Sequence, residues 1–330
     1  MSFRVFSFSI AVFTTGVVCG VFGYRFVREG TFVDIPEDTS RQIRQNSQYV
    51  YTNPLLECEV AQGVIDVQKE NFQKDLESFV YDLKQRRTLT NESIYFRDLN
   101  NGPAFGVDAR EEFFPASLLK VPVMMAYYRW AESEPGLLGT EILYEAPKDF
   151  GMTPTIIPRE QLTVGQSYTV EELIRRMIVY SDNQALRLLS SRLPLEKLRD
   201  LFKIVGAKDE VLVDVNAQLT VKEYAGFFRI LFNSSYLSHD NSEKALRLLA
   251  MTDYDVALKA GVPREVMVSH KFGEAGTGDT ERQLHDCGIV YFPGHPYLAC
   301  IMTRGKDMDA LRQAIEDTSR FIYDKIDGPY

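Results

Sequence analysis

The sequence predicts an α/β fold of the α+β type, in which one lobe is built from both ends of the folded chain and an all-α lobe is inserted between them. Two observations predict it. A helix and a hairpin open the folded part, at 66–107, whereas strands and a helix close it, at 266–326. The region between them has helical patterns interrupted by prolines. We therefore expect an α/β lobe of 66–125 and 260–330, with residues 126–259 as the all-α lobe.

Periodicity and turn residues predict the first elements. Large apolar residues between 66 and 87 recur with the spacing of one helix face: Phe72, Leu76, Phe79, Val80 and Leu83. Alternating residues at 94–96 and 104–107, separated by an Asn-Asn-Gly-Pro turn, predict a hairpin. A further helix is expected from Ser117 to about residue 130.

Two capping boxes mark helix starts in the middle of the chain, at Thr169–Glu172 and Thr220–Glu223. Near the C-terminal end the pattern returns to strands and then to a closing helix with an apolar stripe from Met308 to Ile326. The expected strands are 266–272, 288–292 and 297–303.

Composition excludes several classes of function. The chain has 330 residues, of which 45% are hydrophobic, enough for a large core. A formal charge of -9 argues against nucleic-acid binding, which requires a basic surface. The cysteines form no CxxC pair and the histidines no HExxH motif, so we expect no metal and no cofactor. His285, Cys287 and His295 could be imagined as metal ligands, but ordinary hairpin residues are the simpler interpretation.

The first thirty residues predict a membrane anchor. No charged residue lies between Val5 and Tyr24, and a helix of that length measures about 30 Å, enough to cross a bilayer core. We therefore expect a single-pass cell-membrane protein with residues 1–30 as anchor and the polar segment 31–65 as tether. A cleaved signal peptide, and hence secretion, is the alternative. The arginines on both sides of this segment leave its orientation open.

Ser117 and Lys120 are the first candidate catalytic residues, because side chains three apart share a helix face. A serine hydroxyl becomes a nucleophile when a base takes its proton, and burial can make a lysine that base. Apolar residues surround both positions: Leu118, Leu119, Val121, Val123, Met124 and Met125. The alternative is a serine at a helix N-cap with a lysine that runs out to solvent.

Two further motifs lie downstream, Ser181-Asp182-Asn183 and His270-Lys271-Phe272-Gly273. By themselves they could be a capping box from Ser181 to Gln184 and an edge strand protected by its lysine. In this order, after Ser117 and Lys120, they resemble the S-x-x-K, S-D-N and K-T-G motifs of class A β-lactamases and penicillin-binding proteins. The resemblance covers most of 66–326 and implies an antiparallel sheet flanked by the terminal helices.

The resemblance also implies a role for each motif residue. Ser117 would attack an amide carbonyl after Lys120 takes its proton, and Ser181 would relay a proton to the leaving nitrogen. Backbone N–H groups of Ser117 and Glu274 would stabilise the oxyanion. Lys271 would hold a substrate carboxylate as the more exposed of the two lysines.

The remaining substrate contacts are implied at Asn183, Phe272, Gly273 and Glu274. Phe272 departs from the family pattern, which has a hydroxyl residue there, so binding of a carboxylate should be weaker. The glutamate with which class A β-lactamases deacylate is also missing. In its region the sequence offers only three carboxylates, Asp209, Glu210 and Asp214.

The leading hypothesis is a monomeric, membrane-tethered serine hydrolase that forms an acyl-enzyme with β-lactams or with a peptidoglycan-like D-alanyl peptide and deacylates slowly. The alternative is a non-turnover penicillin-binding or sensor domain of the cell envelope. A purely structural domain with decayed motifs is a third reading. The catalytic domain is expected outside the cytoplasmic membrane, where both substrates are met.

The last hairpin sets the expected state of its two cysteines. In the expected register Cys300 lies opposite Ile289 and Cys287 opposite Met302, which makes the cysteines diagonal neighbours about 7 to 8 Å apart. A disulfide usually needs Cα atoms closer than about 7 Å. Both are therefore expected to be free thiols, unless one of them reaches Cys58.

Overall fold

The computed structural model describes residues 43–44, 49–53, 55–57, 65–87, 89–100, 102–146, 159–214, 216–276 and 281–328. The expected membrane helix and most of the expected tether lie outside these residues. Among the helices that are described, none is both long and apolar enough to cross a bilayer. The chain divides into two units, 1–43 with 55–59 and 44–54 with 60–330. Two short strands, β1 (Ile43–Arg44) and β2 (Leu55–Glu57), pair in a sheet of their own.

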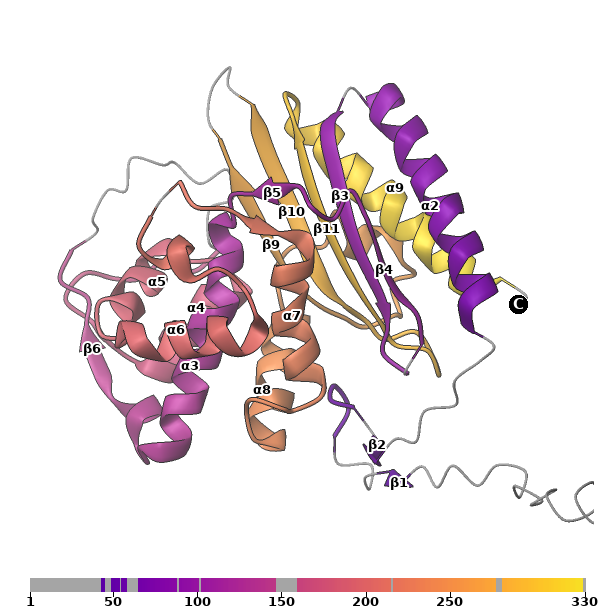
Figure 1. Ribbon diagram of the computed structural model, residues 1–330. Helices are drawn as coiled ribbons and strands as arrows, with labels where there is room; N and C mark the ends of the chain where they lie inside the picture. Colours follow the sequence, from indigo (N-terminus) through magenta and orange to yellow (C-terminus); the bar gives the residue numbers. More distant parts are fainter. Residues whose placement is uncertain are drawn as a thin grey trace, which may run out of the picture. The chain divides into compact units, whose positions relative to one another are not determined.

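A five-stranded antiparallel sheet organises the larger unit, in the order β4-β3-β11-β10-β9. Helices α2 (Ile65–Arg87) and α9 (Met308–Asp327) pack together on one face of this sheet (Figure 1). The predicted α+β fold with its antiparallel sheet and terminal helices is confirmed. The strands are β3 (Leu89–Asp98), β4 (Ala104–Val107), β9 (Val268–Ala275), β10 (Arg282–Val290) and β11 (Tyr297–Gly305).

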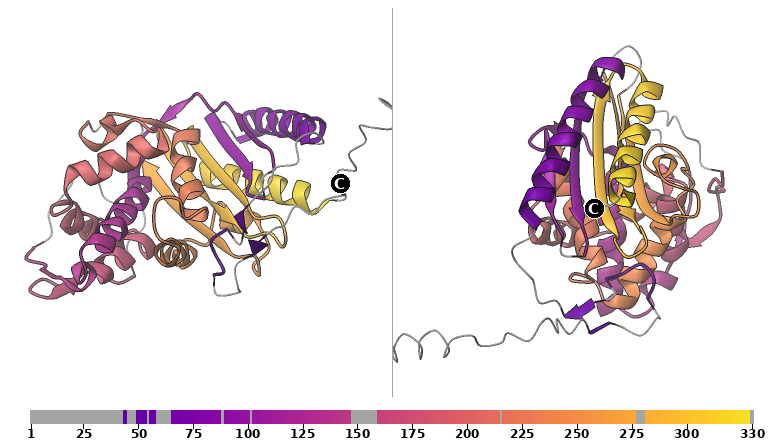
Figure 2. Two further views of the ribbon diagram at one scale, coloured as in Figure 1. Left: turned by 60° about the horizontal axis from the view of Figure 1, so that its bottom comes forward. Right: turned by 90° about the vertical axis from the view of Figure 1, so that its right-hand side faces the viewer.

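The remaining helices lie on the other side of the sheet (Figure 2). The helix expected from Ser117 is in two parts, a 3₁₀ turn η1 (Ala116–Leu119) and helix α3 (Lys120–Ser133). The others are α4 (Val170–Val179), α5 (Asn183–Ser190), α6 (Leu195–Val205), α7 (Val221–Phe232) and α8 (His239–Ala250), with the short 3₁₀ turns η2 (Leu137–Gly139) and η3 (Asp209–Leu212). The 3₁₀ turn η4 (Lys259–Gly261) instead packs against α9. Two small sheets join β5 (Glu112–Phe113) to β8 (Leu219–Thr220) and β6 (Glu141–Leu143) to β7 (Ser167–Thr169).

The central strands are apolar along nearly their whole length because both faces of the sheet are covered. On one face Cys287, Ile289 and Cys300 pack into the core shared with the helical side. On the other, Leu284 and Ile301 pack into the core shared with α2 and α9. The alternation of residues along β10 and β11 therefore joins two hydrophobic cores through one sheet.

Both expected helix starts are confirmed. The Thr169 side chain accepts a hydrogen bond from the Glu172 N–H at the start of α4. Thr220 and Glu223 form a complete capping box at the start of α7. The capping alternative for Ser181 is wrong, because the side chain of Asp182 caps α5 instead.

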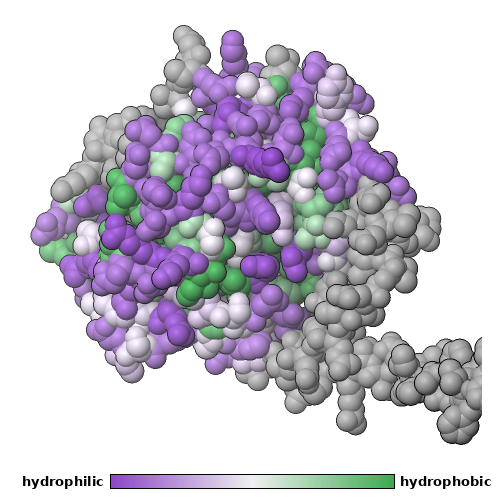
Figure 3. All heavy atoms as spheres, in the orientation of Figure 1, coloured by the Kyte–Doolittle hydropathy of each residue, from purple (hydrophilic) through white to green (hydrophobic). Residues whose placement is uncertain are grey.

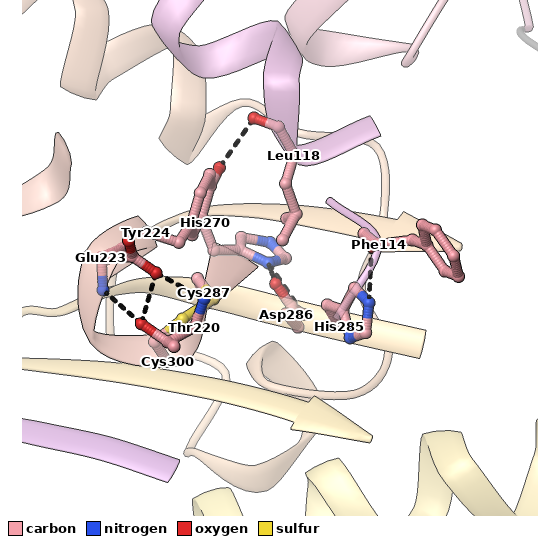
Figure 4. The surroundings of a disulfide bond; sticks show 10 residues. All are labelled: Phe114, Leu118, Thr220, Glu223, Tyr224, His270, His285, Asp286, Cys287 and Cys300. Carbon is pink, nitrogen blue, oxygen red and sulfur yellow. Dashed lines mark hydrogen bonds and ion pairs between the residues drawn. A yellow bond between two sulfur atoms is a disulfide. The ribbon is translucent and has the colours of Figure 1, made fainter. Parts of the chain in front are cut away.

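The predicted register of the last hairpin is wrong. Cys287 lies directly opposite Cys300, with Cα atoms 3.9 Å apart, and the two form a disulfide (Figure 4). The last paired residues before the turn are Val290 and Tyr297, and Gly294 adopts a left-handed conformation with a φ of 77°. This loop shifts the pairing by two residues from the expected register, so the diagonal cysteines become direct partners. Cys58 lies outside the described residues.

Hydrophilic side chains predominate on the face seen in Figure 3, and hydrophobic residues form small groups between them. The exposed large hydrophobic residues come from separate elements: Val50, Tyr81, Leu143, Val164, Ile204, Val213 and Met251. Most apolar side chains of the described residues are instead in the two cores.

Residues 49–53, which we call the strap, pack against other residues of the larger unit, to which they belong. The buried carboxylate of Glu243 accepts hydrogen bonds from the backbone N–H groups of Val50, Tyr51 and Thr52, at 2.7 to 3.0 Å. Tyr291 adds an edge-to-face contact with Tyr51 and donates its hydroxyl to the Tyr51 carbonyl. A carboxylate that accepts several backbone N–H groups is a strong anchor, because each bond is charge-assisted.

We predict that Glu243→Gln lowers the free energy of unfolding by about 2 kcal/mol, because an amide offers one acceptor oxygen and no charge to these N–H groups. The midpoint of urea denaturation measures this change. Asp240→Asn is the matched control, since Asp240 accepts from the Tyr49 hydroxyl in an exposed contact and should change stability by less than about 0.5 kcal/mol. Equal effects of the two variants would contradict the anchoring role of Glu243.

Candidate active site

Ser117 and Lys120 meet at the junction of η1 and α3. The Lys120 Nζ lies 2.8 Å from the Ser117 Oγ. The lysine side chain is fully buried, whereas Ser117 is half-buried and reaches the surface. The alternative in which this lysine runs out to solvent is therefore wrong. Ser117 is not an N-cap either, because Pro115 occupies that position.

Lys120 is surrounded by oxygen atoms from the Ser181 motif. Its Nζ lies 2.7 Å from the Ser181 carbonyl, 2.9 Å from the Ser181 Oγ and 2.7 Å from the Asn183 Oδ1. A carbonyl and an amide oxygen can only accept, so they take the two protons of a neutral amine. The lone pair of that amine is then left for a hydroxyl such as that of Ser117.

Burial gives Lys120 the acid–base properties that this arrangement requires. It lowers the pKa of Lys120 from 10.5 to about 7, against the opposing effect of the Asp182 and Glu274 carboxylates. A lysine with a pKa near neutrality can accept a proton at physiological pH and return it within one reaction cycle.

Lys271 is also fully buried, which corrects the expectation that it is the more exposed lysine. Its Nζ lies 3.1 Å from the Ser181 Oγ and 2.9 Å from the Phe272 carbonyl. Burial, and then the charge of Lys120, hold the pKa of Lys271 well below its usual value. The hydroxyl of Ser181 is therefore placed between two lysine amines, neither of which favours the charged form.

Strand β9 approaches η1 closely at Gly273. A Cβ atom at this position would lie 3.0 Å from the Leu118 Cγ and 3.0 Å from the Pro115 carbonyl oxygen. Any larger residue would require η1 or the strand to give by a few tenths of an ångström. The residue therefore fixes the separation between the strand and the turn that carries Ser117.

The direction of the Glu274 N–H follows from the pairing of the strands. Cys287 and Cys300 are too close for a hydrogen-bonded pair, so the backbone groups of Cys287 point toward β9 and bond to its partner there, Lys271. Along β9 the backbone groups alternate, and those of Phe272 and Glu274 point to the free edge of the sheet. The bond from the Lys271 Nζ to the Phe272 carbonyl agrees with this direction. The Glu274 N–H thus points toward the edge that packs on η1.

Two residues that the sequence analysis did not assign hold the segment before Ser117. The Gln283 side chain accepts from the Phe114 N–H at 3.0 Å, and the His285 Nε2 lies 3.1 Å from the Phe114 carbonyl. Burial lowers the pKa of His285 to about 4, so its neutral ring donates to that carbonyl. Their spacing in the sequence could have indicated that they act together, because side chains two apart on β10 share a face.

Backbone strain accompanies this positioning. Ala116 and Ser181 both have positive φ angles, of 46° and 55°. Such conformations cost about 1 to 3 kcal/mol each and persist where the surrounding structure determines them. The two strained residues lie next to, or within, the group of side chains around Lys120.

The structure offers no metal site among its described residues, and His285 directs its Nε2 to a carbonyl. The three carboxylates considered for deacylation have other partners or are exposed. Asp209 pairs with Arg199, and the Asp214 carboxylate accepts from the Asn216 N–H. Glu210 and Asp214 are exposed. No hydrogen bond or ion pair among the described residues links any of the three to Ser117 or Lys120.

Comparison with known proteins agrees with the fold. PBP-A has a TM-score of 0.66 and 20% identity, over 77% of this chain and 96% of that chain. A class A β-lactamase from Mycobacterium abscessus has a TM-score of 0.65 and 21% identity, over 77% of this chain and 100% of that chain. At these identities the likeness shows the fold alone.

A mutant of PBP-A, described as an acyl-enzyme complex with penicillin G, has a TM-score of 0.64 and 20% identity, over 77% of this chain and 97% of that chain. No curated protein matches the chain. The model of a family described as the Beta-lactamase enzyme family matches residues 72–326. Because this match spans well over half of the sequence, the chain belongs to the beta-lactamase enzyme family.

Proposed function

We propose that the protein is a serine hydrolase that forms an acyl-enzyme through Ser117 with a β-lactam or a D-alanyl peptide. The observation that carries the proposal is the position of the buried Lys120 amine, 2.8 Å from the Ser117 hydroxyl and enclosed by the Ser181 motif. A lysine whose pKa is close to neutral pH, next to a half-buried serine, is the arrangement that activates such a nucleophile.

The reaction begins when the Ser117 proton moves to Lys120 and the Oγ attacks the carbonyl carbon. The oxyanion that forms would accept from the N–H groups of Ser117 and Glu274, on the facing edges of η1 and β9. The carbon–nitrogen bond then breaks, and Ser181 passes a proton from the lysines to the leaving nitrogen. The Oδ1 of Asn183 is directed to Lys120, so its amide nitrogen is the group available to the substrate.

Hydrolysis of the acyl-enzyme also requires a base beside the attacking water. Among the described residues, Asp209, Glu210 and Asp214 make no hydrogen bond or ion pair to Ser117 or Lys120, and the last two are exposed. These contacts support slow deacylation, and they favour a second candidate function, a penicillin-binding or sensor domain that stays acylated.

Export to the outside of the cytoplasmic membrane, with residues 1–30 as anchor, is part of the proposal. The uncharged segment from Val5 to Tyr24 supports it. The disulfide between Cys287 and Cys300 also supports it, because such bonds persist mainly in oxidising compartments.

We predict that the protein gains a penicilloyl adduct that remains visible for minutes in a time course of intact-mass spectra, and that Ser117→Ala gains none while its circular dichroism is unchanged. The matched control is Ser190→Ala, at an exposed serine outside the site, which should be acylated like the native protein. Rapid turnover without an adduct would contradict slow deacylation, and an adduct on Ser117→Ala would contradict the nucleophile.

The pH dependence of acylation follows from Lys120. Its neutral form is the base and its pKa is about 7, so the acylation rate should rise with pH up to that value and level off above it. Lys120→Arg keeps the charge but cannot release its proton, so the rate should fall by about 10²- to 10⁴-fold. Stopped-flow measurements between pH 5 and 9, at roughly unit steps, test both statements. Lys203→Arg, an exposed lysine on α6, is the control, and equal rates in both variants would contradict the assignment.

Location is tested separately. Protease added to intact spheroplasts should remove the domain that contains Ser117, because that domain would lie outside the membrane. A cytoplasmic marker protein must survive the same treatment. Full protection of the domain would contradict export.

A further inference from the structure

Two hydrogen-bond acceptors and an aromatic ring surround the Lys271 amine. The Nζ donates to the Ser181 Oγ and to the Phe272 carbonyl, and the phenyl ring of Phe272 lies over it with the ring centre 3.8 Å away. The whole side chain is inaccessible to solvent. A substrate carboxylate needs a free N–H direction on the amine that binds it.

Phe272 is itself held in place by Tyr254. The two rings are stacked with centres 3.9 Å apart and planes 19° apart, and Phe272 is only 3% exposed. Moving the phenylalanine aside would therefore break a stacked aromatic pair and expose apolar surface. The ring is a fixed cover over the Lys271 amine, in the position where a hydroxyl residue would offer a donor.

Charges near the two lysines do not compensate for this loss. Asp182 and Glu274 are the carboxylates that act on Lys120, whereas Asp286 and Glu274 act on Lys271. Arg304, on the neighbouring part of the sheet, pairs with Glu111 and is near Glu281. Among the described residues an incoming carboxylate would thus meet three acidic groups beside two buried amines whose charged forms are disfavoured.

From these contacts we propose that the site takes acyl donors that carry no carboxylate next to the scissile bond, with an uncharged group in its place. This inference rests on the proposed function of Ser117. It makes Phe272 a residue that determines specificity and makes Lys271 part of the proton path through Ser181. The preferred donors are then neutral esters or amides.

The test compares acylation by benzylpenicillin with acylation by its methyl ester, which differs only in the charge of the carboxyl group. In the full-length native protein the ester should acylate Ser117 at least as fast as the acid, measured by intact mass. Phe272→Thr removes the ring over Lys271 and adds a hydroxyl. It should raise the acid-to-ester ratio of acylation rates by about tenfold or more, the value of one charge-assisted hydrogen bond.

Phe272→Leu is the second variant, because it keeps an apolar cover without a hydroxyl and should leave the ratio close to the native one. Circular dichroism shows whether each variant is folded. Faster acylation of the native protein by the free acid, or an unchanged ratio in folded Phe272→Thr, would overturn this inference alone. Absence of an adduct on Ser117 with both compounds would overturn the proposed function, and the inference with it.

Discussion

The burial of two lysine amines around one serine hydroxyl is the constraint on which the rest of the site depends. Lys120 and Lys271 approach the Ser181 Oγ to 2.9 and 3.1 Å, and neither side chain reaches solvent. Two full charges at such a distance in a buried site would repel each other strongly. The site avoids this repulsion because burial lowers the pKa of both lysines and so favours their neutral forms.

The central sheet connects the buried lysines to the hydrophobic core. Lys271, Cys287 and Cys300 are direct neighbours across three strands, in one row of the sheet. The disulfide therefore joins the two strands behind the strand that carries the lysine. On that same face of β10, Gln283 and His285 hold the segment that leads to the nucleophile. One surface of the sheet thus positions Ser117 and Lys271 together.

Features determined by near neighbours in the chain were predictable from the sequence. The capping boxes at Thr169 and Thr220 depend on four residues each, and the pairing of Ser117 with Lys120 depends on one helical turn. The sheet was predicted from apolar strand patterns that lie next to amphipathic helix patterns in the sequence. Each of these patterns involves residues close together in the chain, so the sequence alone predicts it.

Features that depend on packing between distant segments were not predictable. The register of the last hairpin was missed because it depends on how many residues its loop takes up, which placed Cys287 opposite Cys300. The exposure of Lys271 was missed because Tyr254, from a segment well before the strand, holds Phe272 over it. The motif predicted the identity of that lysine, whereas its environment came from the tertiary structure.

The lack of a side chain at Gly273 matters more for the geometry around Ser117 than for the stability of the sheet. β9 is an edge strand, bonded to one neighbour, so it can move outward without breaking the rest of the sheet. A methyl group at this position would require the strand or η1 to shift by a few tenths of an ångström, which changes the gap between the N–H groups of Ser117 and Glu274. The remaining strands keep their pairing after such a shift, because only β10 is bonded to this edge. The sheet thus tolerates a wider range of positions for β9 than the geometry around Ser117 does.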